Sequence, residues 1–152
     1  MSFIKGLHDV ENSIKLQKYE GEELKTIEVE SSNTLDPSDP RMRICFLDLE
    51  TTGTDHKDDE IIEVAIKCIE ITKENGEDIK VIDIYDSLQD PGIPIPESAT
   101  RINGITDEMV KGHEIDWGQV SKIFNKSQLI VAHNAQFDRG FTDKKIKISK
   151  NK

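Results

Sequence analysis

The chain has 152 residues, of which 35% are hydrophobic and 33% are charged, and its formal net charge is −10. This length suits one domain with a substantial core, and the acidic balance argues against a protein that holds nucleic acid through a broad basic surface. It does not exclude a nuclease, because an acidic site can engage phosphate through bound cations.

No apolar run approaches the roughly 18 residues of a membrane span, so we expect no membrane partner. Residues 1–5 are not followed by the apolar segment of a signal peptide. The two cysteines, Cys45 and Cys68, lie in apolar runs and lack metal-ligand spacing. We therefore expect buried, reduced thiols and, by default, a cytoplasmic location.

The first 40 residues are hard to interpret. Apolar spacing within residues 1–30 fits either a helix or two short strands joined by a turn, and the sequence does not decide between them. Residues 31–40 are small and polar with two prolines, which is typical of a linker. We place the start of the domain near Arg41 and interpret residues 1–40 as an N-terminal extension and linker, with an arm that packs on a sheet edge.

The first chemically distinctive segment reads ICFLDLETTG and runs from Ile44 to Gly53. An apolar run before a turn signal predicts a buried strand, and the two-residue period puts Asp48 and Glu50 on one face of it. Neighbouring carboxylates repel each other and resist burial, and a divalent cation would relieve both effects. Hard cations prefer carboxylate oxygen, so Mg²⁺ or Mn²⁺ is the expected ion. An ordinary acidic strand end is the alternative.

Two further strands are expected after a polar loop that contains His56. Apolar residues dominate positions 61–71, with Glu63 inside the run, and residues 80–88 alternate between apolar and polar. A turn with Asn-Gly chemistry over residues 73–78 separates the two runs. Together with the first strand, they predict an antiparallel meander.

The chain then changes to helical signals. Within residues 95–110, Thr106 followed by two acids predicts a short helix with a hydroxyl N-cap. Core spacing predicts a helix over residues 116–125, with Trp117 in the core rather than serving as a platform for a nucleobase. Residues 129–132 predict a short buried strand that can pair in parallel through this crossover.

A second distinctive segment, HNAQFDRGF, follows that strand. A strand that runs into a polar turn and a helix places side chains at the carboxyl end of a sheet, where open α/β sheets bind ligands. Asn134 would cap the helix and Asp138 would project from its first turn. Compensation of the helix dipole is the alternative role of Asp138. His56 and His113 lie in polar loops and are expected to be solvated.

The string FLDLETTG resembles the first motif of the DEDD superfamily of 3′–5′ exonucleases, which includes the proofreading epsilon subunit of bacterial DNA polymerase III. The IIE string, the INGIT connector and HNAQFD resemble further patterns of that family, so the resemblance covers residues 43–141. It implies an α/β, ribonuclease-H-like mixed sheet, built from a three-strand antiparallel meander plus a parallel strand, with helices and with the C-terminal strand and helix missing. It also implies that His133 is not the catalytic base.

The resemblance further implies a metal-dependent exonuclease that removes 5′-mononucleotides from the single-stranded 3′ end of DNA or RNA. Two Mg²⁺ or Mn²⁺ ions would activate water and stabilise the leaving oxygen. Asp48 would bridge both ions, Glu50 would bind the ion on the water side, and Asp138 would bind the second. The residues implied at the substrate are Thr51, Thr52, Ile105, Met109 and Asn134. A DNA polymerase subunit is an expected partner.

The chain also departs from the family. The third motif, which supplies a fourth aspartate and a histidine or tyrosine base, has no counterpart after Asp138, and Asp143 lies on the wrong face to replace it. Residues 41–142 therefore read as an incomplete exonuclease domain, and residues 143–152 as a solvated, Lys-rich tail. We expect a fragment or a truncated product. The alternatives are a non-catalytic metal- or nucleic-acid-binding module and a polymerase-associated subunit that docks through residues 1–40.

Overall fold

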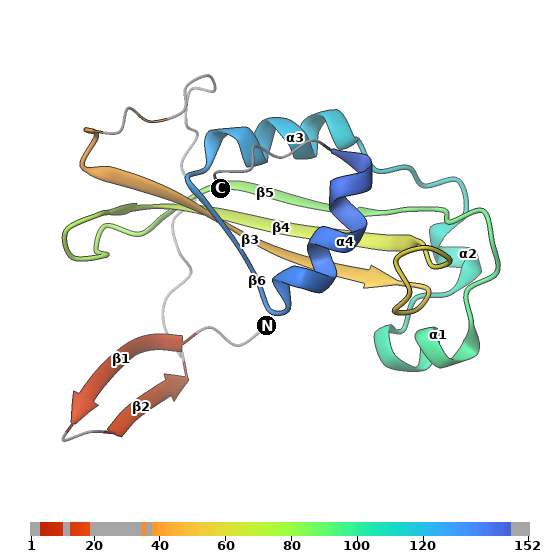
Figure 1. Ribbon diagram of the computed structural model, residues 1–152, viewed down its shortest axis with the longest axis horizontal. Coiled ribbons are helices and arrows are strands. Elements are labelled where there is room, and N and C mark those ends of the chain that lie inside the picture. The colour runs from red at the N-terminus through yellow and green to blue at the C-terminus, as the bar shows by residue number, and fades with distance from the viewer. Residues whose placement is uncertain (1–3, 11–12, 19–34, 36–37, 147–152) are drawn as a thin grey trace.

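The computed structural model describes residues 4–10, 13–18, 35 and 38–146 (Figure 1). The expected linker falls largely outside these residues, as does the end of the Lys-rich tail. The elements in chain order are β1 (Ile4–Val10), β2 (Ser13–Lys18), β3 (Arg41–Thr51), β4 (Ile61–Thr72), β5 (Lys80–Leu88), α1 (Glu97–Asn103), α2 (Asp107–Val110), α3 (Trp117–Lys126), β6 (Leu129–Ala132) and α4 (Ala135–Lys145).

Four strands form one mixed sheet in the order β5-β4-β3-β6. β3 pairs antiparallel with β4, β4 pairs antiparallel with β5, and β6 joins β3 in parallel. The predicted meander, crossover helix, parallel strand and final helix are all confirmed, and so is the mixed ribonuclease-H-like sheet. Because β3 lies between β4 and β6, the first distinctive segment occupies a central strand.

Alternation along β3 determines which side of the sheet is covered. Cys45, Leu47 and Leu49 are buried, whereas the residues between them are only half-buried. The buried side packs with α3 and α4 into the main core. That core contains Cys45, Leu47, Leu49, Ile61, Val64, Ile66, Cys68, Ile115, Val120, Ile123, Phe124, Phe141 and Ile146. Trp117 packs against it, as predicted.

β6 is less buried than its apolar sequence predicts. Leu129 is 39% exposed, and the other three residues of the strand are intermediate. The reason is that β6 is an edge strand: within the described part of the chain, it pairs on one side only, with β3. A short apolar run therefore predicted the strand correctly but its burial incorrectly.

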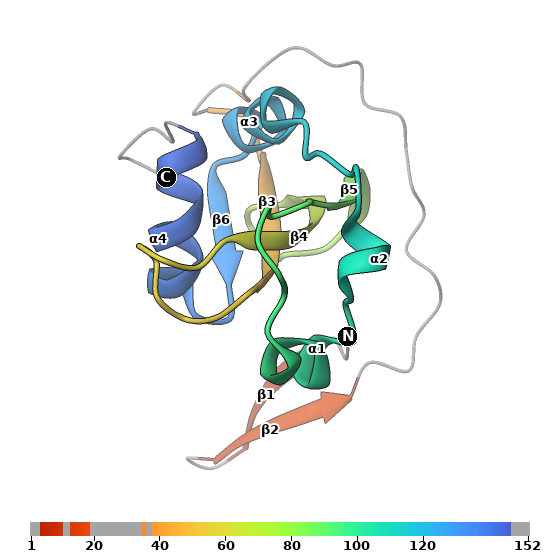
Figure 2. The ribbon, with the colours of Figure 1, turned by 90° about the vertical axis from the view of Figure 1, so that its right-hand side faces the viewer.

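A second, smaller core lies where β4 and the end of β5 meet α1 and α2; these two helices lie beside the ends of the strands (Figures 1 and 2). It contains Ile62, Ile95, Ala99, Ile105 and Val110. Sequence analysis did not predict α1, which ends at Gly104 in the left-handed conformation, with φ of 79°. Thr106 does precede α2, but its hydroxyl makes no capping hydrogen bond, contrary to prediction.

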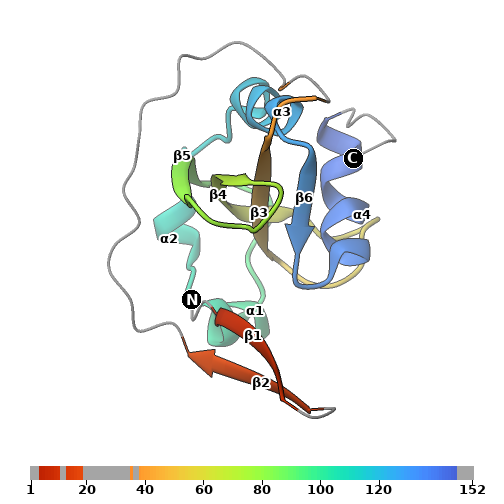
Figure 3. The same cartoon turned by 90° about the vertical axis from the view of Figure 1, so that its left-hand side faces the viewer.

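The N-terminal segment contains a hairpin. β1 and β2 pair antiparallel with each other and form a separate two-stranded sheet (Figures 1 and 3). The helical alternative is therefore wrong for residues 4–10 and 13–18. The expected turn at residues 20–23 and the second expected strand, around Ile27 and Val29, lie outside the described residues. Neither β1 nor β2 pairs with the four-stranded sheet, and the packing of this arm on the sheet edge stays a prediction. No helix among the described residues has the length and apolar character needed to cross a bilayer.

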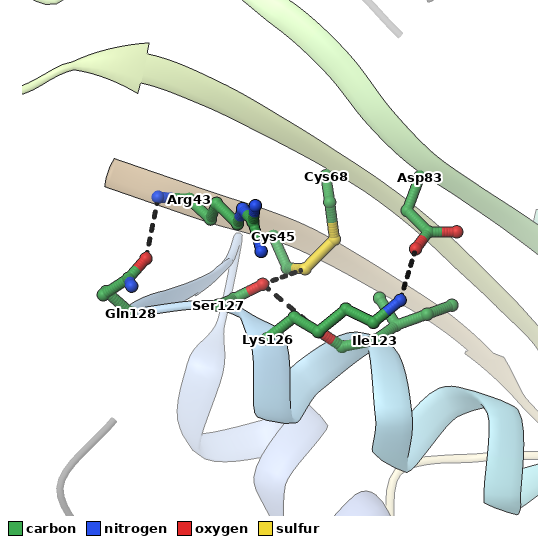
Figure 4. Close-up of a disulfide and its surroundings, with 8 residues drawn as sticks. All are labelled: Arg43, Cys45, Cys68, Asp83, Ile123, Lys126, Ser127 and Gln128. Carbon is green, nitrogen blue, oxygen red and sulfur yellow. Dashed lines mark hydrogen bonds and ion pairs between the residues drawn. A yellow bond between two sulfur atoms is a disulfide. The ribbon is translucent and has the colours of Figure 1, made fainter. Parts of the chain in front are cut away.

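The two cysteines form a disulfide between β3 and β4 (Figure 4). The strand register places Cys45 directly opposite Cys68 on the covered side of the sheet, where cross-strand side chains approach closely. Cys45 Sγ also lies 2.8 Å from Ser127 Oγ. The expectation of reduced thiols is therefore wrong in this structure, because sequence spacing does not reveal strand register. The cytoplasmic location stays a prediction.

Candidate active site

Acidic side chains gather on the less covered side of the sheet, toward the carboxyl end of β3. Asp48 and Glu50 lie on this face and are half-buried, as the two-residue period predicted. Register places Glu63 of β4 directly opposite Glu50, and places Ala65 between Asp48 and Asp86 of β5. Three neighbouring strands therefore contribute carboxylates to one surface.

The charges of this surface act on one another. Burial, and then the negative charge of Asp48, raises the pKa of the Glu50 carboxyl above its usual value. The pKa of Glu63 is also raised, first by burial and then by Asp86, Glu50 and Asp48. Each raised pKa means that the folded protein resists ionisation of that group. The surface therefore favours any ligand that brings positive charge.

The second distinctive segment brings a further carboxylate to the same place. Asp138 lies in the first turn of α4 and is only 5% exposed. Burial raises its pKa, and Asp48 acts in the same direction, while a backbone hydrogen bond and His133 oppose the shift. Asp48 thus acts on both Glu50 and Asp138, residues that come from separate parts of the chain. Asp48, Glu50 and Asp138 are therefore within electrostatic range of one another through Asp48, and their shared role as metal ligands stays a prediction.

Asn134 occupies the N-cap position of α4 but does not cap it with its side chain. Its backbone carbonyl instead accepts hydrogen bonds from Phe137 N at 2.8 Å and Asp138 N at 3.2 Å. The predicted side-chain cap is therefore wrong, because main-chain geometry starts the helix. The Asn134 side chain is exposed, so its predicted contact with substrate stays a prediction.

Sequence analysis missed Asn103, at the end of α1. Its side chain interacts favourably with the ionised Glu50 carboxylate and lowers the pKa of that group, against the larger effect of burial. Its Oδ1 accepts a hydrogen bond from Ile105 N at 2.9 Å. Asn103 therefore connects the INGIT segment to Glu50, a link that only the folded chain reveals.

The turn after β3 is held by its own hydrogen bonds. Thr52 Oγ1 donates to Asp59 Oδ1 at 2.9 Å and accepts from Glu60 N at 3.0 Å, and Thr52 is only 3% exposed. The prediction that Thr52 contacts substrate does not agree with this burial. Thr51 is half-buried and donates to the Gly53 carbonyl. Its role at the substrate stays a prediction.

The two apolar residues predicted at the substrate differ in exposure. Ile105 is 4% exposed and belongs to the smaller core, and its packing against a base stays a prediction. Met109 is 47% exposed and remains available. Ile102 on α1, which sequence analysis did not single out, is 86% exposed and immediately precedes Asn103.

The chemistry of the donor set fits a hard divalent cation. Asp48, Glu50 and Asp138 offer carboxylate oxygens, the ligands that Mg²⁺ and Mn²⁺ prefer, and the last two have raised pKa values that a cation would lower. Within the described residues, however, no three His, Cys, Asp or Glu side chains stand close enough to form a ready-made metal site.

A family model described as Exonuclease matches residues 45–152. The chain is 42% identical over 101 residues to DNA polymerase III PolC-type of Listeria welshimeri, a match that covers 64% of this chain and 6% of that protein. It is 35% identical over 102 residues to the PolC-type polymerase of Caldanaerobacter subterraneus, covering 66% of this chain and 7% of the relative. The chain thus spans only a small part of these relatives.

Solved structures support the fold. A structure titled Exonuclease I (apo) matches with a TM-score of 0.55 and 21% sequence identity, covering 68% of this chain and 24% of the other. E. coli Exonuclease I in complex with a dA16 oligonucleotide matches with the same TM-score and identity, over 68% of this chain and 23% of that one. At this identity, the likeness shows a shared fold.

Proposed function

Because the chain belongs to the exonuclease family, we propose that it carries the site of a divalent-metal-dependent 3′–5′ exonuclease that releases 5′-mononucleotides. One arrangement supports the proposal: Asp48 and Glu50 share one face of the central strand β3, and β3 contacts α4, the helix that carries Asp138. We propose a single-stranded 3′ end of DNA as substrate, because the relatives are named as DNA polymerases. A polymerase is the corresponding partner.

Each carboxylate has a distinct place in this proposal. Asp48, on the central strand, would contact both of two Mg²⁺ or Mn²⁺ ions, while Glu50 and Asp138 would each hold one. When bound, such ions lower the pKa of an attacking water and stabilise the leaving 3′ oxygen. Asn103 would favour the ionised form of Glu50, which is the form that binds a cation.

The rest of the proposed site lies around the terminal nucleotide. Thr51, Met109 and Asn134 remain candidates for contact with it, and the exposed Ile102 adds an apolar surface beside Asn103. Apolar side chains can stack on any base, which suits a nuclease without sequence preference. Thr52 and Ile105 are buried, so they would support this surface from beneath.

The direct test is release of mononucleotide from a 3′-labelled single-stranded oligonucleotide with Mn²⁺. We expect Asp48→Asn to reduce release by roughly 100-fold or more, because even residues that only support metal ligands cost about 10–100-fold. Asp143→Asn is the matched control, since Asp143 is an exposed carboxylate on the same helix as Asp138. Equal release by the wild type and Asp48→Asn would overturn the proposal.

A second candidate function is a non-catalytic module that binds metal or a 3′ end. It is favoured by the lack, among the described residues, of three side chains already placed to hold an ion. A folded wild-type chain that binds Mn²⁺ and single-stranded oligonucleotide but releases no mononucleotide would select this candidate.

A further inference from the structure

His56, in the loop between β3 and β4, contacts α4 beside Asp138. Its Nε2 lies 3.1 Å from the carbonyl oxygen of Phe137, and a carbonyl can only accept, so Nε2 carries the proton. The imidazole also packs against the rings of Phe137 and Phe141, with centroids 5.7 Å and 4.8 Å away. The expectation that His56 is solvated is therefore wrong, because its partners lie far away in sequence.

Gly140 provides the space for this contact. A Cβ added at Gly140 would overlap the His56 ring at Nε2, Cδ2 and Cε1. The ring cannot easily move aside, because two phenylalanines and a hydrogen bond hold it. Glycine in a helix interior costs about 1 kcal/mol relative to alanine, and here that cost allows the loop to approach the helix backbone.

Hydrogen bonds within the loop that carries His56 stabilise its conformation. The Asp59 carboxylate accepts hydrogen bonds from Thr52 Oγ1 at 2.9 Å and from Asp55 N at 2.8 Å. Asp55 in turn accepts bonds from Lys57 N at 2.8 Å and Asp59 N at 2.8 Å. The base of this loop continues directly from Glu50, so a contact between the loop and α4 links the two halves of the acidic site.

We propose that His56 is a positioning residue that holds α4, and with it Asp138, at the correct distance from Asp48. Gly140 leaves the space that the His56 ring occupies against the helix. The inference rests on the proposed function, in which Asp138 and Asp48 share bound ions. Phe137, whose carbonyl receives the His56 hydrogen bond, directly precedes Asp138 in α4. Displacing the imidazole would therefore move the backbone next to the carboxylate that the site requires.

A double-mutant cycle tests the proposal, with Mn²⁺ affinity measured from the electron paramagnetic resonance signal of free Mn²⁺. We expect His56→Ala and Gly140→Ala each to weaken Mn²⁺ binding by about 10-fold, the scale observed for residues that orient metal ligands. In the His56→Ala background the space is already empty. There Gly140→Ala should cause no further loss, so the two effects will not add.

Two controls separate positioning from folding and from the proposed function. Thermal unfolding verifies that each variant is folded at the temperature of the assay. Lys145→Met removes a second contact between the same loop and helix, an exposed pair at 3.5 Å with Glu60, and should leave Mn²⁺ affinity unchanged. Asp48→Ala should abolish binding.

The outcomes are distinct. Unchanged Mn²⁺ affinity in folded His56→Ala, or fully additive losses of affinity in the double variant, would overturn the positioning role. In that case, loss of Mn²⁺ binding in Asp48→Ala would still support the proposed function. A wild-type chain that binds no Mn²⁺ would overturn the proposed metal site and the positioning role with it.

Discussion

The two ends of the β3–β4 pair differ in how their charged side chains are paired. At the start of β3, Arg43 lies directly opposite Glu70, and its Nε donates to Glu70 Oε2 at 3.0 Å, with both side chains almost fully buried. At the other end, Glu50 lies directly opposite Glu63, and two like charges meet. Among the described residues, no lysine or arginine forms an ion pair with Asp48, Glu50 or Asp138.

The Arg43–Glu70 pair stabilises the fold, whereas the carboxylates around Glu50 are available to bind a ligand. Glu70 is satisfied within the chain, with Arg41 as a second partner at 3.3 Å. Among the described residues no ion pair compensates Glu50 or Asp138, and burial raises the pKa of both carboxyls. Such perturbed groups concentrate at functional sites, and here the structure shows both situations along one pair of strands.

The largest expected effect on stability is at the end that carries the Arg43–Glu70 ion pair. Glu70→Ala would leave the Arg43 guanidinium buried without its carboxylate, and removal of one partner of a buried ion pair costs about 3–5 kcal/mol. We expect the free energy of unfolding, measured by urea titration, to fall by that amount. Arg41→Ala is the control, because Arg41 is 48% exposed and exposed pairs contribute about 0–1 kcal/mol. A loss under 1 kcal/mol for Glu70→Ala would contradict the comparison.

The next largest effect is at the end where Glu50 lies opposite Glu63. There an added cation should stabilise the protein. At 100 times its dissociation constant, Mn²⁺ should add about 2.7 kcal/mol to the free energy of unfolding, and EDTA should reverse the gain. Protons compete for Glu50 and Asp138, whose pKa values are raised. The gain should therefore be larger at pH 7.5 than at pH 5. A gain that is the same at both pH values, or that survives in Asp48→Asn, would place the ion elsewhere.

The smallest effect concerns Glu63. Its raised pKa means that the folded protein keeps this proton to higher pH than the unfolded chain does. The free energy of unfolding therefore falls as pH rises from the usual glutamate pKa through the raised one. Without metal, Glu63→Gln should stabilise the protein by roughly 0.5 kcal/mol at pH 7.5, since like charges across strands repel, and by nothing at pH 4.

A matched control for Glu63→Gln is Glu97→Gln. Glu97 is exposed and pairs with Arg101 on α1, so loss of its charge should give no gain in stability. If both variants behave alike at pH 7.5, the repulsion at the carboxyl end of β3 is not significant.

Local pattern was sufficient to predict most of the sheet. The alternation in β3 and β5 and the helical spacing of Trp117, Val120 and Phe124 depend on the residues themselves and on burial. The same reasoning placed Asp48 and Glu50 on one face. It did not predict α1, because this short helix buries only Ala99 and lacks an apolar stripe.

Apart from α1 and the two helix caps, the features that were not predicted depend on strand register or on contacts between residues far apart in the sequence. Nothing in the sequence places Cys45 opposite Cys68, or His56 against Gly140. The burial of Ile105 and Thr52 depends on how the connecting segments fold back onto the sheet. A motif therefore identified which carboxylates matter, but not which neighbours orient them.

The parallel pairing of β3 with β6 has a consequence for the order of folding. β3, β4 and β5 follow one another in the chain and pair across the nearby connections 52–60 and 73–79, whereas the bond from Arg43 N to Gln128, just before β6, joins residues 85 apart. Closing so long a loop costs more conformational entropy than forming a hairpin, and such distant pairings slow folding. We expect the meander to form first and the strand that carries α4 to dock late. Asp138 would then be among the last groups to reach its place, so the site would exist only in molecules that have completed their fold.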